Sequence, residues 1–322
     1  MRHPPFFAWR ITLVLALALV AARGQFTGFQ NKGLVAVGRL SGEGFDALGP
    51  GVDTLGGIFS GMAFAVNSWE RTGDGQSGFT YRGQLFCAPD RNAGTLDFHP
   101  RVHTLQVVMT PYYGSAPVPQ TQIALTLTGT RLLSDGTTLL TGASGNDNAQ
   151  PWFPKSTNAS AGQGRRSLDC EGLTLTRGGG FFVCDEYGPF VYRFDAAGVL
   201  VATLRPPPAW IPRVGASYGS RTVDFGMVAT PASGRRNSSG IEGVALSPDE
   251  TRLFALLQSP LVQDRGGDTG SRNTRVLVFD LTPGSPTQDQ PIAEYVYQLT
   301  LNGSESGTRQ TLASDLVAIN SH

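Results

Sequence analysis

The chain has 322 residues, of which 40% are hydrophobic and 16% are charged, and its 25 Lys and Arg residues balance 25 Asp and Glu residues. This composition suits one large globular domain with an apolar core and excludes a disordered chain or a coiled coil. Lys32 and Lys155 are the only lysines, and the balance of charge argues against broad electrostatic binding of nucleic acid.

The first 24 residues have the pattern of a secretory signal peptide. Arg2 and Arg10 precede an apolar run at residues 11–22, and small residues lead up to Gln25. The run is shorter than the about twenty apolar residues that span a bilayer, so we expect cleavage and secretion rather than a membrane anchor. The segment carries arginines and no acidic residue, so the mature domain, residues 25–322, is mildly acidic.

The 41 glycines and 21 prolines predict many turns between short strands. A first, loose sheet module begins at residues 60–64 and continues at 86–91, after a polar insertion at 69–81. The stretches 110–166 and 205–239 are predicted to be long excursions between modules.

The clearest module spans residues 169–204. Apolar and polar residues alternate after its start, and a glycine run predicts a turn. Further strands are expected at Phe181–Cys184, Phe190–Phe194 and residues 199–204. Four short antiparallel strands joined by tight turns are the unit of one β-propeller blade.

The same pattern recurs at residues 240–246, followed by a turn and a strand at Arg252–Gln258. Outer strands are expected at 275–281 and 293–301, and residues 313–320 resemble the start of a further module that the chain leaves unfinished. Long helical periodicities are absent. We therefore predict an all-β fold, a β-propeller of four-stranded antiparallel blades with an incomplete last blade, rather than an α/β fold.

Three phrases in these modules carry a family resemblance. They are Asp169–Leu173, Cys184–Asp195 and Gly240–Asp249, the last followed by Ala255–Pro260. Through them the chain resembles the secreted phytase-like family, also called the "esterase-like activity of phytase" domain, over roughly residues 33–319. The resemblance implies a secreted β-propeller and hydrolysis of phosphate or other esters.

Six carboxylates fall at equivalent places in the modules, near the ends of the predicted inner strands. In a propeller such positions converge around one channel mouth, where clustered carboxylates bind a hard cation such as Ca²⁺. A bound cation polarises an ester for attack by water. The expected metal ligands are Asp90, Asp169, Glu171, Asp185 and Glu242. The expected catalytic residues are Glu171, Asp185, Glu186 and Glu242. The alternative is structural, because acids beside glycine at strand ends commonly accept hydrogen bonds from turn amides.

Arginines near the same phrases are candidates for substrate binding. A guanidinium presents a planar fork of donors that fits phosphate oxygens. The candidates are Arg91, Arg165, Arg166 and Arg193. The expected partner is a small ester or phosphoester.

Other catalytic patterns lack their structural context. Residues 215–219 match G-x-S-x-G, but no strand precedes and no helix follows, so Ser217 is not expected to be a nucleophile. Pro100 opposes the helix that would bring His99 and His103 together, so we expect histidines in surface loops rather than zinc ligands.

Secretion bears on cysteines and asparagines. The cysteines form no C-x-x-C motif, so we expect small buried residues with at most one disulfide. They are Cys87, Cys170 and Cys184. Sequons at Asn158, Asn237 and Asn302 predict N-glycosylation.

Two functions remain open from the sequence. The first is a metal-assisted hydrolase, which rests on the resemblance and the acidic residues. The second is a non-catalytic secreted β-propeller that binds a ligand or protein partner on its rim. The same blade pattern serves both.

Overall fold

The computed structural model describes residues 32–48, 55–76, 78–90, 97–145, 153–157, 162–264, 271–300 and 312–321. The predicted signal peptide, Arg91, and the sequons at Asn158 and Asn302 lie outside them. Within the described residues the chain is all-β, as predicted, and its only helical segments are 3-10 turns. These are Val66–Ser68, Pro208–Trp210, Tyr218–Ser220 and Val262–Asp264.

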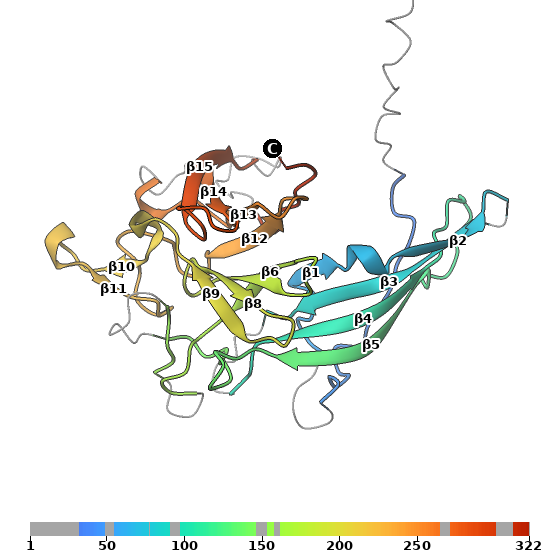
Figure 1. Cartoon of the computed structure of the whole chain (residues 1–322), viewed down its shortest axis with the longest axis horizontal. Helices are drawn as coiled ribbons and strands as arrows, with labels where there is room; N and C mark the ends of the chain where they lie inside the picture. Colours follow the sequence, from blue (N-terminus) through green and yellow to red (C-terminus); the bar gives the residue numbers. More distant parts are fainter. Residues whose placement is uncertain are drawn as a thin grey trace, which may run out of the picture.

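Three antiparallel sheets contain most of the strands (Figure 1), and their strands run outward in chain order except that in sheet 1 both β1 and β2 pair with β3. Sheet 1 contains β1 (Gly61–Phe64), β2 (Glu70–Asp74), β3 (Gly78–Ala88), β4 (Arg101–Met109) and β5 (Ile123–Leu132). Sheet 2 contains β6 (Cys170–Leu175), β7 (Phe181–Asp185), β8 (Val191–Phe194) and β9 (Leu200–Leu204). Sheet 3 contains β12 (Ile241–Leu246), β13 (Arg252–Leu257), β14 (Asn273–Asp280) and β15 (Pro291–Gln298). A short ribbon pairs β10 (Arg213–Val214) with β11 (Thr222–Val223).

The first strands of the three sheets, β1, β6 and β12, lie side by side in the middle of the molecule (Figure 1). A glycine in each strand permits this approach, because a Cβ on Gly172 would lie 2.6 Å from the carbonyl oxygen of Glu242 on β12. Gly61 meets the carbonyl of Glu171 in the same way. The repetition extends to Gly243, whose added Cβ would lie 2.9 Å from the carbonyl carbon of Asp315.

Sheet 2 is buried on both faces, and this explains the uninterrupted apolar sequence of β7. Phe181 and Val183 point into the core between sheets 1 and 2. Phe182 and Cys184 point into the core between sheets 2 and 3. A third core covers the other face of sheet 1, where Leu55 and Ile58 pack on β3 and β4. Successive strand residues face opposite sides, so one strand supplies two cores.

The modules predicted from the sequence are confirmed as antiparallel sheets, four-stranded in sheets 2 and 3 and five-stranded in sheet 1, and the adjacent first strands are consistent with propeller blades. The strands expected at Phe181–Cys184, Phe190–Phe194 and Arg252–Gln258 are present with ends shifted by one residue. The described residues do not form a closed ring, so the propeller itself stays a prediction.

The predicted polar insertion and the first predicted excursion both contain sheet structure. The insertion at 69–81 is a hairpin in which β2 pairs with the extended start of β3. The stretch 110–166 includes β5, which pairs with β4 along its whole length. Both were missed because their turns and polar faces resemble loop sequence. The stretch 205–239 does connect sheets, yet it buries Trp210 completely.

The three cysteines are free and buried. Cys170 belongs to the core between sheets 1 and 2, and Cys184 to the core between sheets 2 and 3. Because their side chains lie on opposite faces of sheet 2, they do not pair. Burial raises the pKa of the Cys87 thiol to about 12. The interpretation of the cysteines as small buried residues is confirmed.

Candidate functional site

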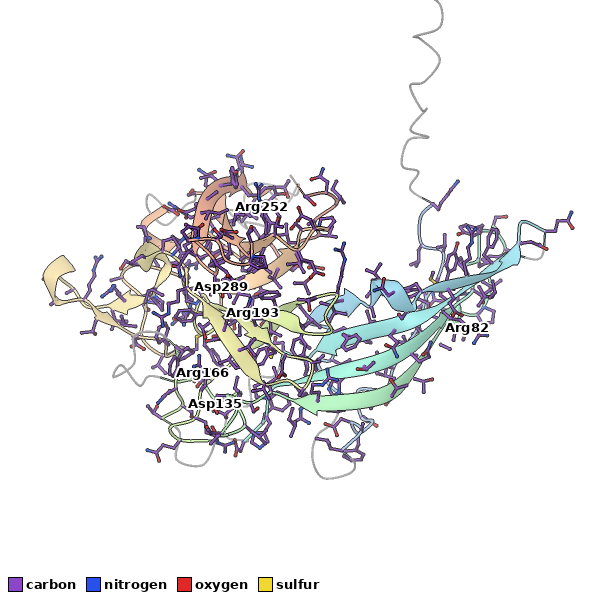
Figure 2. The ribbon with its side chains drawn as sticks, in the orientation of Figure 1. Arg82, Asp135, Arg166, Arg193, Arg252 and Asp289 are labelled. Atoms are coloured by element: carbon purple, nitrogen blue, oxygen red, sulfur yellow. The ribbon has the colours of Figure 1, made fainter. Side chains whose placement is uncertain are left out.

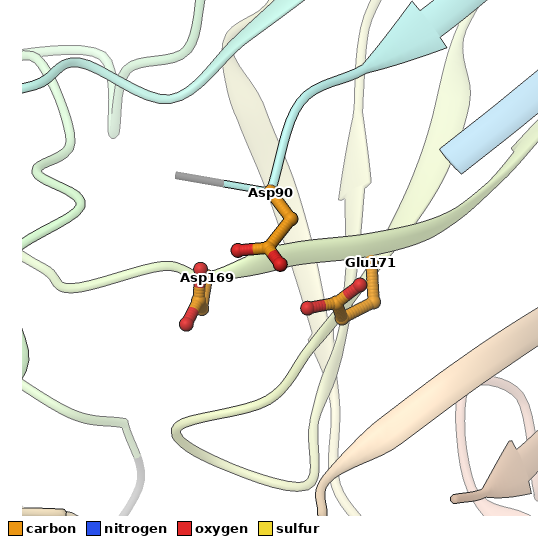
Figure 3. A group of neighbouring side chains, drawn as sticks. All are labelled: Asp90, Asp169 and Glu171. Carbon is orange, nitrogen blue, oxygen red and sulfur yellow. The ribbon is translucent and has the colours of Figure 1, made fainter. Parts of the chain in front are cut away.

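Five carboxylates from three sheets converge where the inner strands meet. We call Asp90, Asp169, Glu171, Glu186 and Glu242 the acid cluster. One oxygen each of Asp90, Asp169 and Glu171 lies within 4.8 Å of the others, as does one oxygen each of Glu171, Glu186 and Glu242. Figure 3 shows the first group, with Asp90 on the segment after β3 and the other two at the start of β6. Five of the six carboxylates that were expected to converge thus lie close together, and Asp185 is not among them.

Strand topology produces this convergence. The start of β6 and the end of β7 lie at the same end of sheet 2, because the two strands are antiparallel and Cys170 pairs with Asp185. Glu171 and Glu242 each precede the inner-strand glycine, and the close approach at that glycine brings consecutive modules together. Asp90 follows β3, which pairs with β1 in sheet 1, next to sheet 2.

Asp169 is the least solvated member of the cluster. Its side chain is 1% exposed, and neither carboxylate oxygen has a partner with hydrogen-bond geometry among the described residues, although the side chains of Glu186 and Tyr187 lie close enough to interact with it. Burial, followed by the negative charges of Asp90 and Glu186, raises the pKa of Asp169 well above its usual value. A buried carboxylate without donors is costly, because nothing replaces its lost hydration. Its two oxygens are therefore available to a ligand.

Glu171 lies at the centre of the cluster and belongs to both groups. The Ser60 hydroxyl donates a hydrogen bond to its Oε2 at 2.6 Å. Burial and then the charge of Glu242 raise the pKa of Glu171 to about 9. Ser60 precedes Gly61 as Glu171 precedes Gly172, so superposing the modules would have identified this contact from the sequence.

Glu242 accepts a hydrogen bond from the side-chain amide of Gln258, at the end of the neighbouring strand. Burial, followed by the charges of Glu186 and Asp90, raises the pKa of Glu242 to about 8. A carboxyl group with a pKa near neutrality is suited to accept a proton from water. Sequence analysis identified Glu242 but not its partner Gln258.

Asp185 differs from the cluster, because both of its oxygens are satisfied by the protein. Oδ1 accepts bonds from the backbone amides of Asp169 and Tyr187, at 3.0 and 3.1 Å. Oδ2 accepts from the amide of Gly188 at 3.1 Å and the hydroxyl of Tyr192 at 3.3 Å. For Asp185 the geometry favours the structural alternative over the expected metal or catalytic role. Burial raises the pKa of Asp185 to about 7 even though these donors oppose the rise.

A buried arginine that the sequence analysis missed supports the turn between β7 and β8. Arg235 is 0% exposed, and its guanidinium donates to the carbonyl oxygens of Tyr187 and Phe225. Burial lowers the pKa of Arg235 to about 10, although the charges of Asp185 and Glu186 oppose the decrease. Arg235 thus brings a positive charge next to the acid cluster. Nothing in its local sequence marks this role, since the Tyr187 carbonyl that it supports lies 48 residues earlier in the chain.

One known protein family matches most of the chain. The family described as "Phytase-like: Esterase-like activity of phytase" matches residues 73–322. The chain belongs to the phytase-like family. A relative from Arthroderma benhamiae, named "Uncharacterized secreted protein", is 34% identical over 300 residues, which cover 84% of this chain and 56% of the relative. The phytase-like chain therefore spans little more than half the length of that relative.

Within its described residues, the phytase-like chain has no helix long and apolar enough to cross a bilayer. Asn237 is the one predicted glycosylation site among these residues. Its Nδ2 donates to the carbonyl oxygens of Met227 and Ala229, at 3.0 and 2.9 Å. Glycosylation there stays a prediction.

The arginines expected to bind substrate in this phytase-like chain have partners within the protein. Arg165 pairs with Asp97. Arg193 donates to both carboxylate oxygens of Asp289, at 3.2 and 3.4 Å (Figure 2). Their substrate-binding role stays a prediction.

Arg166 packs against an aromatic side chain. Its guanidinium carbon lies 3.6 Å from the centroid of the Phe153 ring, and Nη1 donates to the hydroxyl of Thr203 at 3.3 Å. This stacking engages one face of the guanidinium. A role in substrate binding therefore stays a prediction for Arg166 too, and Arg91 lies outside the described residues.

The serine and histidine candidates lie apart from the acid cluster. Ser217 is exposed and precedes a 3-10 turn, so the strand–turn–helix context of a serine esterase is absent there. His103 is 1% exposed on β4 and contacts the hydroxyl of Thr130, so the expectation of a surface-loop histidine was wrong. The alternating pattern of β4 predicts its burial better than the neighbouring Pro100 does.

Proposed function

We propose that this chain is a secreted β-propeller that hydrolyses phosphate or other esters with the help of a divalent cation, Ca²⁺ in the first instance. The observation that carries the proposal is the pair of unpartnered, buried oxygens of Asp169 within a converging set of carboxylates. Family membership supports the esterase-like chemistry. The signal-peptide pattern and a relative named as secreted support export.

The carboxylates of Asp90, Asp169 and Glu171 would hold the cation, since hard cations prefer such oxygen ligands. A bound divalent cation supplies a Lewis acid that neutralises charge on a phosphoryl or acyl oxygen. The three residues come from two sheets, so the folded core fixes their positions before substrate arrives. Arg235 supports the turn that carries Glu186 beside them.

Glu242 is proposed as the general base. The pKa of Glu242, about 8, lies close to neutral pH, so the side chain accepts a proton from water more readily than an ordinary glutamate does. The Gln258 amide keeps one of its oxygens in place. One of the Glu242 oxygens lies within 4.8 Å of oxygens of Glu171 and Glu186.

The second candidate function is a non-catalytic propeller that binds a partner on its rim. It is favoured by exposed apolar side chains on the outermost strand of sheet 3. These are Tyr295, Val296 and Tyr297, between 51% and 65% exposed. Such a protein would bind without turnover.

The proposal is tested by assaying the secreted, full-length chain on phytate, a nitrophenyl phosphate and a nitrophenyl acetate, with Ca²⁺ or with a chelator. Hydrolysis in Ca²⁺ that is lost in the chelator supports it. The Glu242→Gln variant should lower kcat by a factor of about 10² or more, as expected on removal of a general base. Glu43→Gln, the same change at an exposed acid outside the cluster, should leave activity unchanged. Absence of turnover on every ester would favour the binding function.

A further inference from the structure

The two groups of carboxylates in the acid cluster are not separate. They share Glu171, one oxygen of which lies within 4.8 Å of oxygens from Asp90 and Asp169, and one within 4.8 Å of oxygens from Glu186 and Glu242. A carboxylate has two oxygens and four lone-pair directions, so it can bridge two cations. The Glu171 side chain is held between the two groups by its location on β6 and by the hydrogen bond from the Ser60 hydroxyl.

We propose that the acid cluster binds two divalent cations at adjoining positions, bridged by the Glu171 carboxylate. The first position is formed by Asp90, Asp169 and Glu171, and the second by Glu171, Glu186 and Glu242. This inference rests on the proposed hydrolase function and specifies its site. It also replaces the general-base role proposed for Glu242 with the role of a cation ligand.

Asp169 provides the independent observation that a ligand belongs here. Both of its oxygens are buried and neither has a partner with hydrogen-bond geometry, and one of them lies within 4.8 Å of oxygens of Asp90 and Glu171. Asp185, on the neighbouring strand, shows how the protein satisfies a carboxylate that has a structural role. From this contrast we infer that Asp185 stabilises the turn, whereas Asp169 binds a ligand.

Charge indicates the number of cations. Once cations displace the protons that the buried acids hold, the five carboxylates and the guanidinium of Arg235 carry four net negative charges, and of the five carboxylates Asp90 is exposed to solvent. One divalent cation would leave half of this charge unbalanced, whereas two would neutralise it. Uncompensated charge is costly at low dielectric.

A pair of cations also narrows the substrate class. Paired metal ions clamp the attacking and leaving oxygens of a phosphoryl group, and a phosphate oxygen can contact both. Arg165 and Arg193 are already paired with aspartates, so attraction of a phosphate falls mainly to bound cations. We therefore expect phosphate esters to be preferred over carboxylic esters.

The test measures Ca²⁺ binding to the chelator-treated full-length chain by equilibrium dialysis and calorimetry. The expected result is two Ca²⁺ per chain for the wild type and for the Glu43→Gln control. Asp169→Asn and Glu242→Gln should each retain one, whereas Glu171→Gln should lower the affinity for both by at least tenfold. Circular dichroism and thermal melting would verify that each variant folds.

A second measurement needs no variant. Loading the wild-type chain with Tb³⁺ and Eu³⁺ together should give luminescence energy transfer within one molecule, because the two ions occupy neighbouring positions. One Ca²⁺ per chain without such transfer would overturn the inference and leave the single-cation hydrolase standing. No Ca²⁺ binding at all would remove both the inference and the proposed metal-assisted function.

Discussion

Two hydrogen bonds join the Arg235 guanidinium to the carbonyl oxygen of Tyr187, one from Nε at 2.7 Å and one from Nη2. Tyr187 belongs to the turn that Asp185 also holds, through its amide, and Glu186 lies between them. The turn thus has a buried cation on one side and a buried carboxylate on the other. This arrangement holds the backbone at Glu186 in place through its neighbours, so the Glu186 side chain stays within the acid cluster.

Arg235→Met should therefore destabilise the fold. The substitution removes the guanidinium that donates hydrogen bonds to the Tyr187 and Phe225 carbonyl oxygens. We expect a loss of about 2–5 kcal/mol in the free energy of unfolding, measured by urea denaturation. Arg252→Met, at an exposed position on β13, is the control and should change stability by less than about 0.5 kcal/mol. Equal effects in the two variants would contradict the supporting role of Arg235.

Gly172→Ala should disturb the packing of β6 on β12. The added methyl would lie 2.6 Å from the Glu242 carbonyl oxygen and 2.8 Å from the Val244 nitrogen, both backbone atoms that do not move freely. A loss of about 1–3 kcal/mol is expected in thermal or denaturant unfolding. Gly178→Ala is the matched control, because the nearest atom to its new methyl is 3.8 Å away. Equal stability of the two variants would show that the inner strands are less tightly packed.

The pH dependence of stability follows from the raised carboxyl pKa values. In a chelator, the folded chain holds protons on Glu171 and Glu242 up to about pH 9 and 8, which an unfolded chain has already released. Since the unfolded state binds fewer protons, the free energy of unfolding should fall as pH rises from about 5 to about 9. The loss should be on the order of a few kcal/mol and absent below about pH 4.

Calcium should reverse this trend, because the cation replaces the protons. Thermal melts between pH 4 and 9, with Ca²⁺ or with a chelator, would measure both slopes. A stability that stays flat with pH in the chelator would mean that the cluster is more hydrated than its burial indicates.

Much of the fold was predictable from the sequence, and the reason lies in its repetition. The strand–turn–strand phrases around Phe181 and Arg252 are local, and glycine and alternation locate them within one residue. β5 was missed because it pairs with β4 across a long polar connection, and pairing at a distance leaves no local signal. His103 was misplaced because Pro100 was given more weight than the strand pattern that follows it.

The acid cluster was predictable in membership but not in detail. The position before each inner-strand glycine identified Glu171 and Glu242, because the same step relates successive modules. Asp169 and Asp185 differ because backbone amides donate hydrogen bonds to the Asp185 carboxylate and not to that of Asp169. The local sequence does not determine the direction of these amides. Arg235 reaches the turn from a loop about fifty residues away, so the one buried cation described beside the cluster had no sequence signal.

Asp185→Asn tests the structural role that the geometry gives to this aspartate. An asparagine keeps an oxygen for the Asp169 and Tyr187 amides but places an NH₂ group where the Gly188 amide and Tyr192 hydroxyl donate. We expect a loss of about 1–3 kcal/mol in unfolding free energy, with Ca²⁺ stoichiometry unchanged. Calorimetry and denaturant unfolding on the same preparation would separate these effects. Loss of a bound Ca²⁺ from a folded variant would return Asp185 to the set of metal ligands.

Asp169→Asn should have the opposite pair of effects. In a chelator at pH 8–9 the substitution removes a carboxylate that is buried, repelled by its neighbours and without a hydrogen-bond partner. The free energy of unfolding should therefore rise, by about 1 kcal/mol or more, since an uncompensated buried charge is lost. In Ca²⁺ the wild type should be the more stable of the two, because bound Ca²⁺ stabilises the wild type more than it stabilises the variant. Thermal melts of both proteins, with and without Ca²⁺, would show curves that change order. A variant that is less stable than the wild type in both conditions would mean that Asp169 has a structural role.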